Sequence, residues 1–217
     1  MANLPLWEQI YRQFLMRWQD LFDALLRHVG LVLISMVVTI VIGVFLGILI
    51  TRVKPLQSIV LGIANVLQTI PSLALLGFMI PLFGIGTTSA IVALFLYSLL
   101  PIIRNTYTGI MNVDEPTLEA ARGMGMTDRQ ILFKVQLPLA FSVIMAGIRT
   151  AATINVGTAT LAAFIGAGGL GDFILLGIQR AMNSLILLGA IPAALLALLI
   201  DWLLGKLEIA STPKGLR

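Results

Sequence analysis

The chain has 217 residues, of which 59% are hydrophobic and only 11% are charged. Soluble domains use about 45–50% apolar residues, so this composition excludes an ordinary soluble fold and predicts an integral membrane protein. The net charge of +4 comes from basic residues scattered around apolar segments, which excludes a nucleic-acid-binding stripe. The absence of cysteine excludes disulfides, thiolate metal sites and cysteine nucleophiles.

The first 28 residues predict an amphipathic helix. They are not a signal peptide, because acidic residues and arginines alternate through them without an early apolar core. Over residues 6–26 apolar side chains recur at helical spacing: Trp7, Ile10, Tyr11, Phe14, Trp18, Leu21, Phe22 and Leu25. Such a helix lies in a membrane interface, so we expect residues 1–28 to form an interfacial helix on the outer membrane surface.

Five apolar stretches predict five transmembrane helices within a domain at 29–205. Residues 29–50 are uncharged and long enough to cross a bilayer, which takes about 20 residues. Residues 55–103 carry no charge and predict two crossings with a turn at 81–86. Crossings at 139–164 and 181–200 follow, and residues 206–217 then form a tail. The predicted fold class is therefore all-α and polytopic.

Two kinds of small or polar pattern occur within the predicted spans. Ser35, Thr39, Gly43 and Gly47 recur every four residues, which predicts a helix face that another helix approaches closely. The second pattern consists of polar stripes, in which side chains face either a substrate pathway or another helix. Both interpretations remain open for the stripe residues, which are Asn65, Gln68, Thr69 and Ser72 in one span and Thr153, Asn155 and Thr158 in another.

The charged loop at 112–137 predicts two short helices joined by a hinge. Asp114 or Glu115 can cap the first helix, with Pro116 in its first turn. Gly125 is typical of the left-handed turn that ends a helix. Thr127 then opens a second helix as a capping box, with Gln130 three residues on. The sequence therefore predicts a compact docking knob at the membrane surface.

One motif in this loop carries a family resemblance. Glu119-Ala120-Ala121 is followed after three residues by Gly125 and after nine more by Val135-Gln136-Leu137-Pro138. This pattern resembles the permease subunits of type I bacterial ABC importers, whose signature is Glu-Ala-Ala, three residues, Gly, nine residues and Ile-x-Leu-Pro. Only Val135 departs from it. The resemblance implies a type I permease fold and a coupling helix that fits a groove on a separate ATPase, with Glu119, Ala120, Ala121, Gly125, Leu137 and Pro138 as coupling residues.

Charge distribution orients the predicted spans. Most basic residues fall on the side of the coupling loop: Arg52, Lys54, Arg104, Arg122, Arg129, Lys134, Lys206, Lys214 and Arg217. The opposite side has Arg12, Arg17, Arg27 and Arg180. By the positive-inside rule the loop side is cytoplasmic, which predicts an outer N-terminus and a cytoplasmic C-terminus.

Other candidate sites favour structural roles. The segment 166–171 fits G-x-G-x-x-G, yet it links two spans and is interpreted as a tight backbone elbow. The chain has no phosphate-binding loop, so it is not predicted to be an enzyme, and no cofactor or metal is expected. His28 is interpreted as solvated or interfacial. Arg149 is expected to form a structural pair with Asp201 within the membrane.

Three further segments narrow the resemblance. Residues 64–74, 104–107 and 155–162, the last followed by the glycine segment 166–171, resemble the osmoprotectant branch, which imports glycine betaine, carnitine or choline; the methionine permeases are the nearest alternative. The resemblance implies a bacterial inner (plasma) membrane location. The implied partners are an ABC ATPase dimer, a second permease subunit (identical or paralogous) and an extracytoplasmic binding protein. Quaternary ammonium groups usually bind in aromatic cages, and the spans have few aromatic residues, so we expect selection by the binding protein.

Two alternatives belong to other classes. An ion-coupled secondary transporter predicts ionisable relays or an inverted repeat, and neither is visible in the sequence. A structural membrane scaffold leaves the loop motif unexplained.

Overall fold

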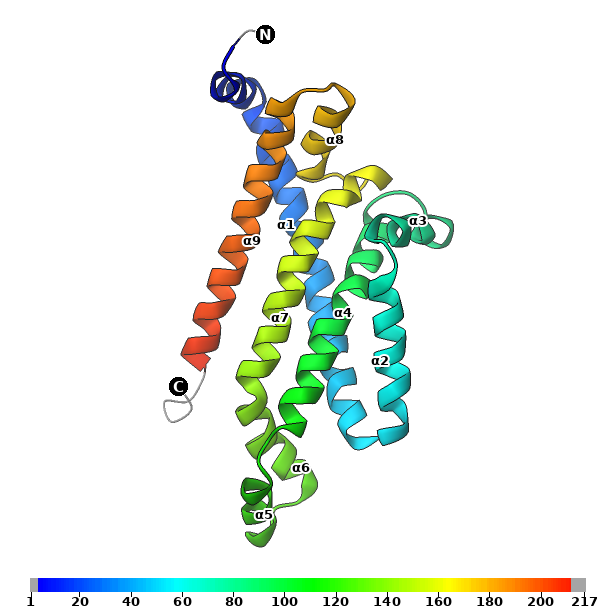
Figure 1. Ribbon diagram of the computed structural model, residues 1–217, viewed down its shortest axis with the longest axis vertical. Coiled ribbons are helices and arrows are strands. Elements are labelled where there is room, and N and C mark those ends of the chain that lie inside the picture. Colours follow the sequence, from blue (N-terminus) through cyan, green and yellow to red (C-terminus); the bar gives the residue numbers. More distant parts are fainter. Residues whose placement is uncertain (1–3, 212–217) are drawn as a thin grey trace.

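The computed structural model describes residues 4–211, in which every regular element is a helix (Figure 1). Residues 1–3 of the predicted interfacial helix and 212–217 of the predicted tail lie outside the described residues. The helices are α1 (Leu6–Arg52), α2 (Lys54–Thr69), α3 (Ser72–Phe83), α4 (Thr87–Met111), α5 (Glu115–Gly123), α6 (Asp128–Ile131), the π-helical η1 (Leu132–Gln136), α7 (Leu137–Ala159), the 3-10 helix η2 (Thr160–Ile165), α8 (Gly171–Gln179) and α9 (Asn183–Ser211). The predicted all-α class is confirmed.

Four helical stretches are long and apolar enough to cross a membrane: α1, α4, the stretch Asp128–Ile165 that contains α7, and α9. A fifth crossing exists only if α2 and α3 together form one broken span, because the two helices are bent by 104°. Pro71 explains the break. Its ring disfavours helical geometry at the preceding residue, and Ile70 is extended at φ −64° and ψ 129°. The predicted turn at 81–86 is confirmed, with Gly84 and Gly86 at positive φ.

The N-terminal boundary differs from the prediction. The helix kinks at Arg17 (φ −131°, ψ 20°), and the chain then continues as one helix to Arg52. In Figure 1 the segment before the kink is seen almost end-on, whereas the rest of α1 runs down the molecule. Only residues 6–16 therefore form a segment separate from the membrane-spanning helix. Residue 28 lies within that continuous helix and not at a boundary. At the other end of the chain, α9 extends through the first part of the predicted tail.

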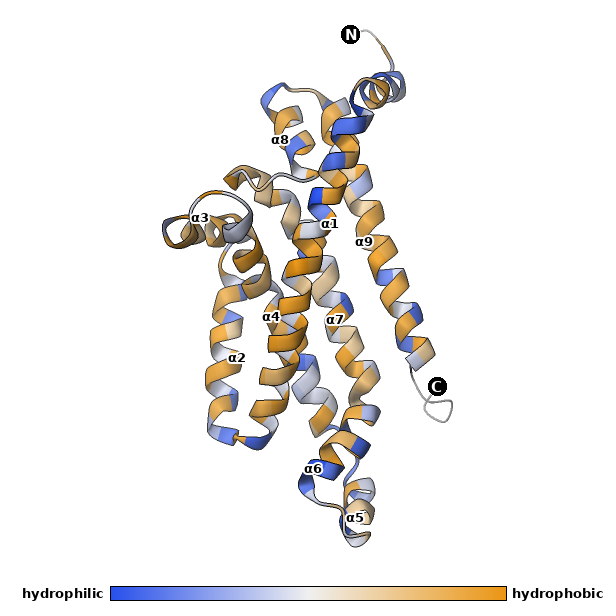
Figure 2. Cartoon of the chain, turned by 180° about the vertical axis from the view of Figure 1, so that it is seen from behind, coloured by the Kyte–Doolittle hydropathy of each residue, from blue (hydrophilic) through white to orange (hydrophobic). Residues whose placement is uncertain are grey.

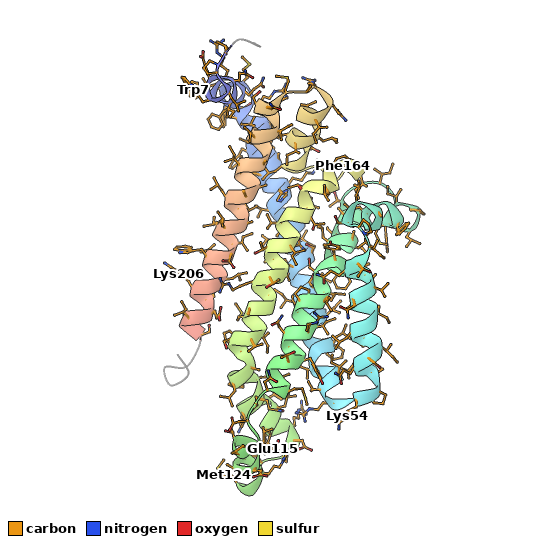
Figure 3. All side chains as sticks on the ribbon, viewed as in Figure 1. Trp7, Lys54, Glu115, Met124, Phe164 and Lys206 are labelled. Atoms are coloured by element: carbon orange, nitrogen blue, oxygen red, sulfur yellow. The ribbon has the colours of Figure 1, made fainter. Side chains whose placement is uncertain are left out.

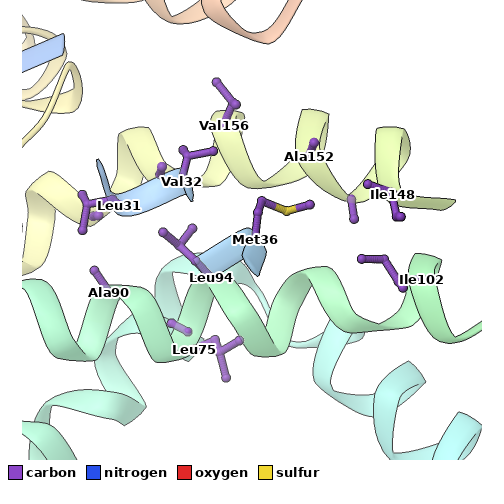
Figure 4. Close-up of a cluster of buried hydrophobic side chains, with 14 of the residues drawn as sticks. Leu31, Val32, Met36, Leu75, Ala90, Leu94, Ile102, Ile148, Ala152 and Val156 are labelled. Atoms are coloured by element: carbon purple, nitrogen blue, oxygen red, sulfur yellow. The ribbon is translucent and has the colours of Figure 1, made fainter. Parts of the chain in front are cut away.

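The core lies where α1 packs between α4 and α7. Figure 4 shows Val32 and Met36 of α1 between Leu94 of α4 and Ala152 of α7. The predicted small-residue face of α1 is buried against α4, because a Cβ at Gly47 would lie 2.5 Å from Thr106 Cβ. The helix-packing prediction is thus confirmed. Figure 2 shows that the long helices are coloured mostly hydrophobic, whereas α5 and α6 carry a mixture of hydrophilic and hydrophobic residues.

The glycine segment between η2 and α8 forms the predicted elbow. Gly166, Gly168 and Gly169 have positive φ, and a side chain at Gly171 would collide with the Thr160 carbonyl. The elbow covers His28, which is fully buried with Nε2 3.2 Å from the Val156 carbonyl oxygen. The prediction of a solvated or interfacial His28 is wrong, because the folded elbow removes this side chain from solvent.

Candidate functional site: the α5–α6 knob and the polar stripes

The knob consists of α5 and α6 and occupies residues 115–131 at one end of the molecule (Figure 1). Asp114 caps α5, accepting hydrogen bonds from the Thr117 backbone N–H at 3.2 Å and from the Thr117 hydroxyl at 2.7 Å. The hydroxyl bond lowers the pKa of Asp114 below its usual value. Pro116 lies in the first turn, where its missing N–H costs no hydrogen bond. The predicted cap is confirmed.

A left-handed turn at Gly125 ends the first helix. Gly125 has φ 77°, its N–H donates to the Arg122 carbonyl at 2.9 Å, and the Met126 N–H donates to the Ala121 carbonyl at 3.2 Å. These two bonds form a Schellman motif, the common ending for a helix that stops at glycine. A Cβ at Gly125 would meet nothing within 4 Å, so only backbone conformation requires glycine here.

The second helix begins with the predicted capping box. The Thr127 N–H donates to Gln130 Oε1 at 2.8 Å, and the Gln130 N–H donates to Thr127 Oγ1 at 3.4 Å. Together with the cap at Asp114 and the turn at Gly125, these bonds set the conformation of the knob through local chemistry.

The knob has a small apolar core of its own, formed by Leu118, Ala121 and Ile131. The Glu-Ala-Ala motif is therefore divided, because Ala121 is buried whereas Glu119 and Ala120 are exposed. Met124 at the tip is 75% exposed (Figure 3). The exposed part of the knob is thus available to contact another protein.

The base of the knob passes through a π-helical turn into α7. Pro138 has no N–H, so the usual bond to the carbonyl four residues earlier is missing. The preceding residue, Leu137, donates its N–H to the carbonyl of Leu132, which lies five residues earlier rather than four. Leu137 is half-buried and Pro138 is exposed. This turn joins the motif directly to a long transmembrane helix.

The first polar stripe does not remain on one helix. Asn65, Gln68 and Thr69 lie on α2, whereas Ser72 begins α3 beyond the 104° bend. Asn65 Oδ1 accepts a hydrogen bond of 2.8 Å from Arg104 Nη2 of α4. Gln68 and Ser72 are half-buried and Thr69 is exposed. Because α2 and α3 run in different directions, Ser72 does not share one helix face with Asn65, Gln68 and Thr69.

The second stripe is divided between two environments. Thr153 is exposed and borders an open groove of about 410 Å³ beside α7, and Thr158 is half-buried. Asn155 is fully buried, with Nδ2 donating to Ser98 Oγ and Oδ1 accepting from Ser35 Oγ, both at 3.0 Å. These contacts join α7 to α1 and α4, which favours the helix-packing interpretation of Asn155 over the pathway interpretation.

Arg149 joins α7 to α9. It donates to both carboxylate oxygens of Asp201 at 2.9 and 3.0 Å, which confirms the predicted pair. A second acceptor, Glu208, lies 3.1 Å from Nη1 and was not predicted. Glu208 follows Asp201 by seven residues, two helical turns, so helical spacing alone could have identified it.

Comparisons with known proteins agree with this architecture. Residues 39–209 match the family model described as "Binding-protein-dependent transport system inner membrane component". The chain is 50% identical over 191 residues to the carnitine transport permease protein OpuCB of Listeria monocytogenes, covering 88% of each chain. It is 49% identical over 196 residues to the osmoprotectant import permease protein OsmW of Salmonella typhimurium, covering 88% of this chain and 91% of OsmW.

Among solved structures, the chain is similar to an inward-facing MetNI methionine ABC transporter, with a TM-score of 0.80 and 26% identity. The similarity covers 91% of this chain and 98% of that one. In this family ATP hydrolysis is carried out by a separate ATPase subunit. With its family match spanning most of the sequence and a fold like that of a known importer, the chain belongs to the binding-protein-dependent, multi-pass inner membrane permeases of ABC transporters.

Proposed function

We propose that this permease forms the translocation pathway for a quaternary ammonium osmoprotectant such as glycine betaine, carnitine or choline. Relatives named for carnitine, for glycine betaine, carnitine and choline, and for choline are 48–50% identical to it. The sequence identity to the methionine importer is only 26%, so the osmoprotectant assignment is favoured over the amino-acid alternative. The ion-coupled alternative is set aside, because the family works with a binding protein.

The α5–α6 knob is the observation that carries the coupling mechanism. Its exposed Glu119 and Ala120, its buried Ala121 and its Gly125 turn form a rigid projection at one end of the spans. In this proposal each knob enters a groove on an ATPase of a dimeric pair. When ATP binding closes that pair, α7 receives the movement through Leu137 and Pro138, which lie at its start.

The complete importer contains two permease subunits, identical or paralogous, and an extracytoplasmic binding protein that selects the substrate. The N-terminus lies outside and the C-terminus inside, with five crossings if α2 and α3 count as one broken span. Lys54 lies toward the knob end and Trp7 at the opposite end, as Figure 3 shows. The excess of basic residues predicted on the knob side of the spans, Lys54 among them, supports the orientation by the positive-inside rule.

Labelling single introduced cysteines tests this orientation, because the chain has no cysteine of its own. Gly84→Cys should react with an impermeant reagent in intact cells, since Gly84 is exposed between α3 and α4. Thr127→Cys in the knob should react only after the membrane is opened. If Thr127→Cys reacted in intact cells, the knob would lie outside and the proposed orientation would be wrong.

The pathway is proposed to include Asn65, Gln68, Thr69, Ser72, Thr153 and Thr158. Asn65 holds Arg104, and Thr153 borders the groove beside α7. Hydroxyl and amide groups at these positions would offer weak, transient contacts to a passing substrate. Asn155 is assigned to packing instead.

The deciding experiment uses the permease reconstituted in vesicles with its ATPase and binding protein. Gly125→Val should lower uptake and ATPase association, because a β-branched residue in the left-handed region costs about 1–2 kcal/mol. Glu119→Lys should have a smaller effect, since it changes one exposed charge. Gly123→Ala is the matched control, because Gly123 is helical and a Cβ there would meet nothing within 4 Å.

Membrane insertion should be normal in all three variants. If Gly125→Val and Glu119→Lys both transport at the wild-type rate, the knob is not the coupling element. Glycine betaine, carnitine, choline and methionine would be tested in parallel, and uptake of methionine alone would refute the substrate assignment.

A further inference from the structure

A buried glutamine lies at the base of the knob, where three long helices meet. Gln136 is 9% exposed and ends the π-helical turn η1. Its Oε1 accepts a hydrogen bond of 2.9 Å from Arg52 Nη2, and its Nε2 donates to the Ile110 carbonyl at 3.5 Å. Arg52 ends α1, Ile110 lies in the last turn of α4, and Gln136 directly precedes α7. One amide thus links the ends of α1 and α4 to the start of α7.

Apolar packing does not fill this junction. A recess of about 210 Å³ separates the knob from the spans and is bordered by Arg52, Ile110, Glu115, Arg122 and Gln136. The knob core of Leu118, Ala121 and Ile131 is a cluster distinct from the main core. Leu132, which follows Ile131, and Ile110 belong to the main core, so the base of the knob is held both by apolar packing and by the polar contacts of Gln136.

The side chain at 136 must serve as donor and acceptor at once. An amide can accept from a guanidinium through its oxygen and donate to a carbonyl through its nitrogen. The bond from Arg52 is charge-assisted, and such bonds are about twice as strong as neutral ones. An apolar residue of similar size would keep the packing and lose both links.

We propose that Gln136 is a positioning residue for transport: it holds the knob in register with α1 and α4, so that knob movement moves all three helices together. This inference rests on the proposed coupling function of the knob. The motif leaves this position variable, so the role is assigned by the contacts to Arg52 and Ile110.

The test measures substrate imported per ATP hydrolysed in vesicles that contain the permease, its ATPase and its binding protein. Gln136→Leu should lower this ratio about tenfold, the effect of losing a hydrogen bond to a charged group, while ATP hydrolysis continues. Gln136→Glu should recover part of the ratio, because its ionised carboxylate still accepts from Arg52 but can no longer donate to the Ile110 carbonyl. Gln57→Leu on α2 is the control for the same chemical change outside the junction.

A second variant guards against misfolding. Arg52 is exposed, so Arg52→Met should fold, and it should lower the ratio as Gln136→Leu does. Combining the two changes should add little, because both remove the same bond. Spin labels at Val53→Cys and Thr117→Cys should also show a broader distance distribution when Gln136 is replaced by leucine.

The outcomes separate this inference from the proposed function. If Gly125→Val uncouples transport while Gln136→Leu and Arg52→Met keep the wild-type ratio, the role of Gln136 is refuted and the knob remains the coupling element. If none of these variants changes the ratio, the coupling function itself fails. Equal loss in Gln136→Leu and Gln136→Glu would also refute the inference, because the Arg52 bond would then be irrelevant.

Discussion

Asn155→Leu should destabilise the permease without acting on the transport pathway. Asn155 joins α7 to two other spans, through Ser35 of α1 and Ser98 of α4, each at 3.0 Å. A third bond, from Nδ2 to the Leu94 carbonyl, is 3.4 Å long. Leucine removes all three bonds and brings a side chain of comparable length into a fully buried site.

The magnitude follows from what each partner retains. Ser35 keeps its 3.0 Å bond to the Val32 carbonyl, so its hydroxyl is not left unsatisfied. Hydrogen bonds between membrane helices contribute about 0.6 kcal/mol on average and up to about 1.7 kcal/mol. Losing two such bonds and a longer one, with Ser98 left without its amide partner, should cost about 2 kcal/mol. For a chain of this size that corresponds to a Tm lower by about 4–8 °C.

Thermal unfolding of the detergent-purified permease measures this change, and uptake per folded complex is measured in parallel. Thr150→Val is the control, because Thr150 is exposed on the same helix and its hydroxyl donates only to the backbone carbonyl of Ala146. The packing assignment predicts a lower Tm for Asn155→Leu with uptake per folded complex preserved. An unchanged Tm combined with lost uptake would return Asn155 to the pathway and refute this reasoning.

Three further predictions concern packing, charge and capping. Gly47→Val should reduce the yield and Tm of folded protein, because its Cβ would collide with α4. Gly62→Ala is the control, because a Cβ there would meet nothing within 4 Å. Equal yields of the two variants would argue against close packing of α1 on α4. Asp201→Asn should lower the Tm slightly, since Arg149 loses one of its two carboxylate partners, and an unaltered Tm would contradict this. The lowered pKa of Asp114 means that its cap stabilises α5 above the unfolded pKa of about 3.9 and is lost as pH falls through the folded value. The amide-exchange protection factors of α5, corrected for the intrinsic rate, should therefore fall at low pH in the wild type but not in Asp114→Asn.

The knob could be predicted almost completely because its structure depends on local chemistry. The cap at Asp114, the left-handed Gly125 and the Thr127–Gln130 box each join residues a few positions apart. A sequence displays such relations directly, because side-chain and backbone partners fall at fixed spacings. The π-helical turn was not predicted, although Pro138 was the residue that required an adjustment of the hydrogen-bond ladder.

The course of the spans was less predictable. Hydropathy identifies apolar length but contains no information on direction, so the 104° bend at Pro71 was not anticipated within the uncharged run 55–103. The kink at Arg17 occurs at neither proline nor glycine, the usual causes, so no local signal marks it.

The polar contacts between spans depend on the folded arrangement. Gln136 and Arg52 are 84 positions apart, and Asn155 and Ser35 are 120 apart. Their residue types showed that polar partners were needed in an apolar setting, but only the packing of α1 against α4 and α7 shows which partners meet. The Arg149–Asp201 pair was predictable because charges are so few in these spans.

The bend between α2 and α3 also affects the surrounding lipid. At 16 residues, α2 is about 24 Å long, whereas the hydrocarbon core of a typical bilayer is about 30 Å thick. Backbone groups at the bend leave the helical ladder, and Thr69 and Pro71 are exposed there. Since an irregular backbone is not stable in contact with hydrocarbon, this bend must be covered by another subunit, meet water, or lie where the bilayer thins. If lipid reaches this flank, the short α2 makes it a place of hydrophobic mismatch, where transport would depend on acyl-chain length.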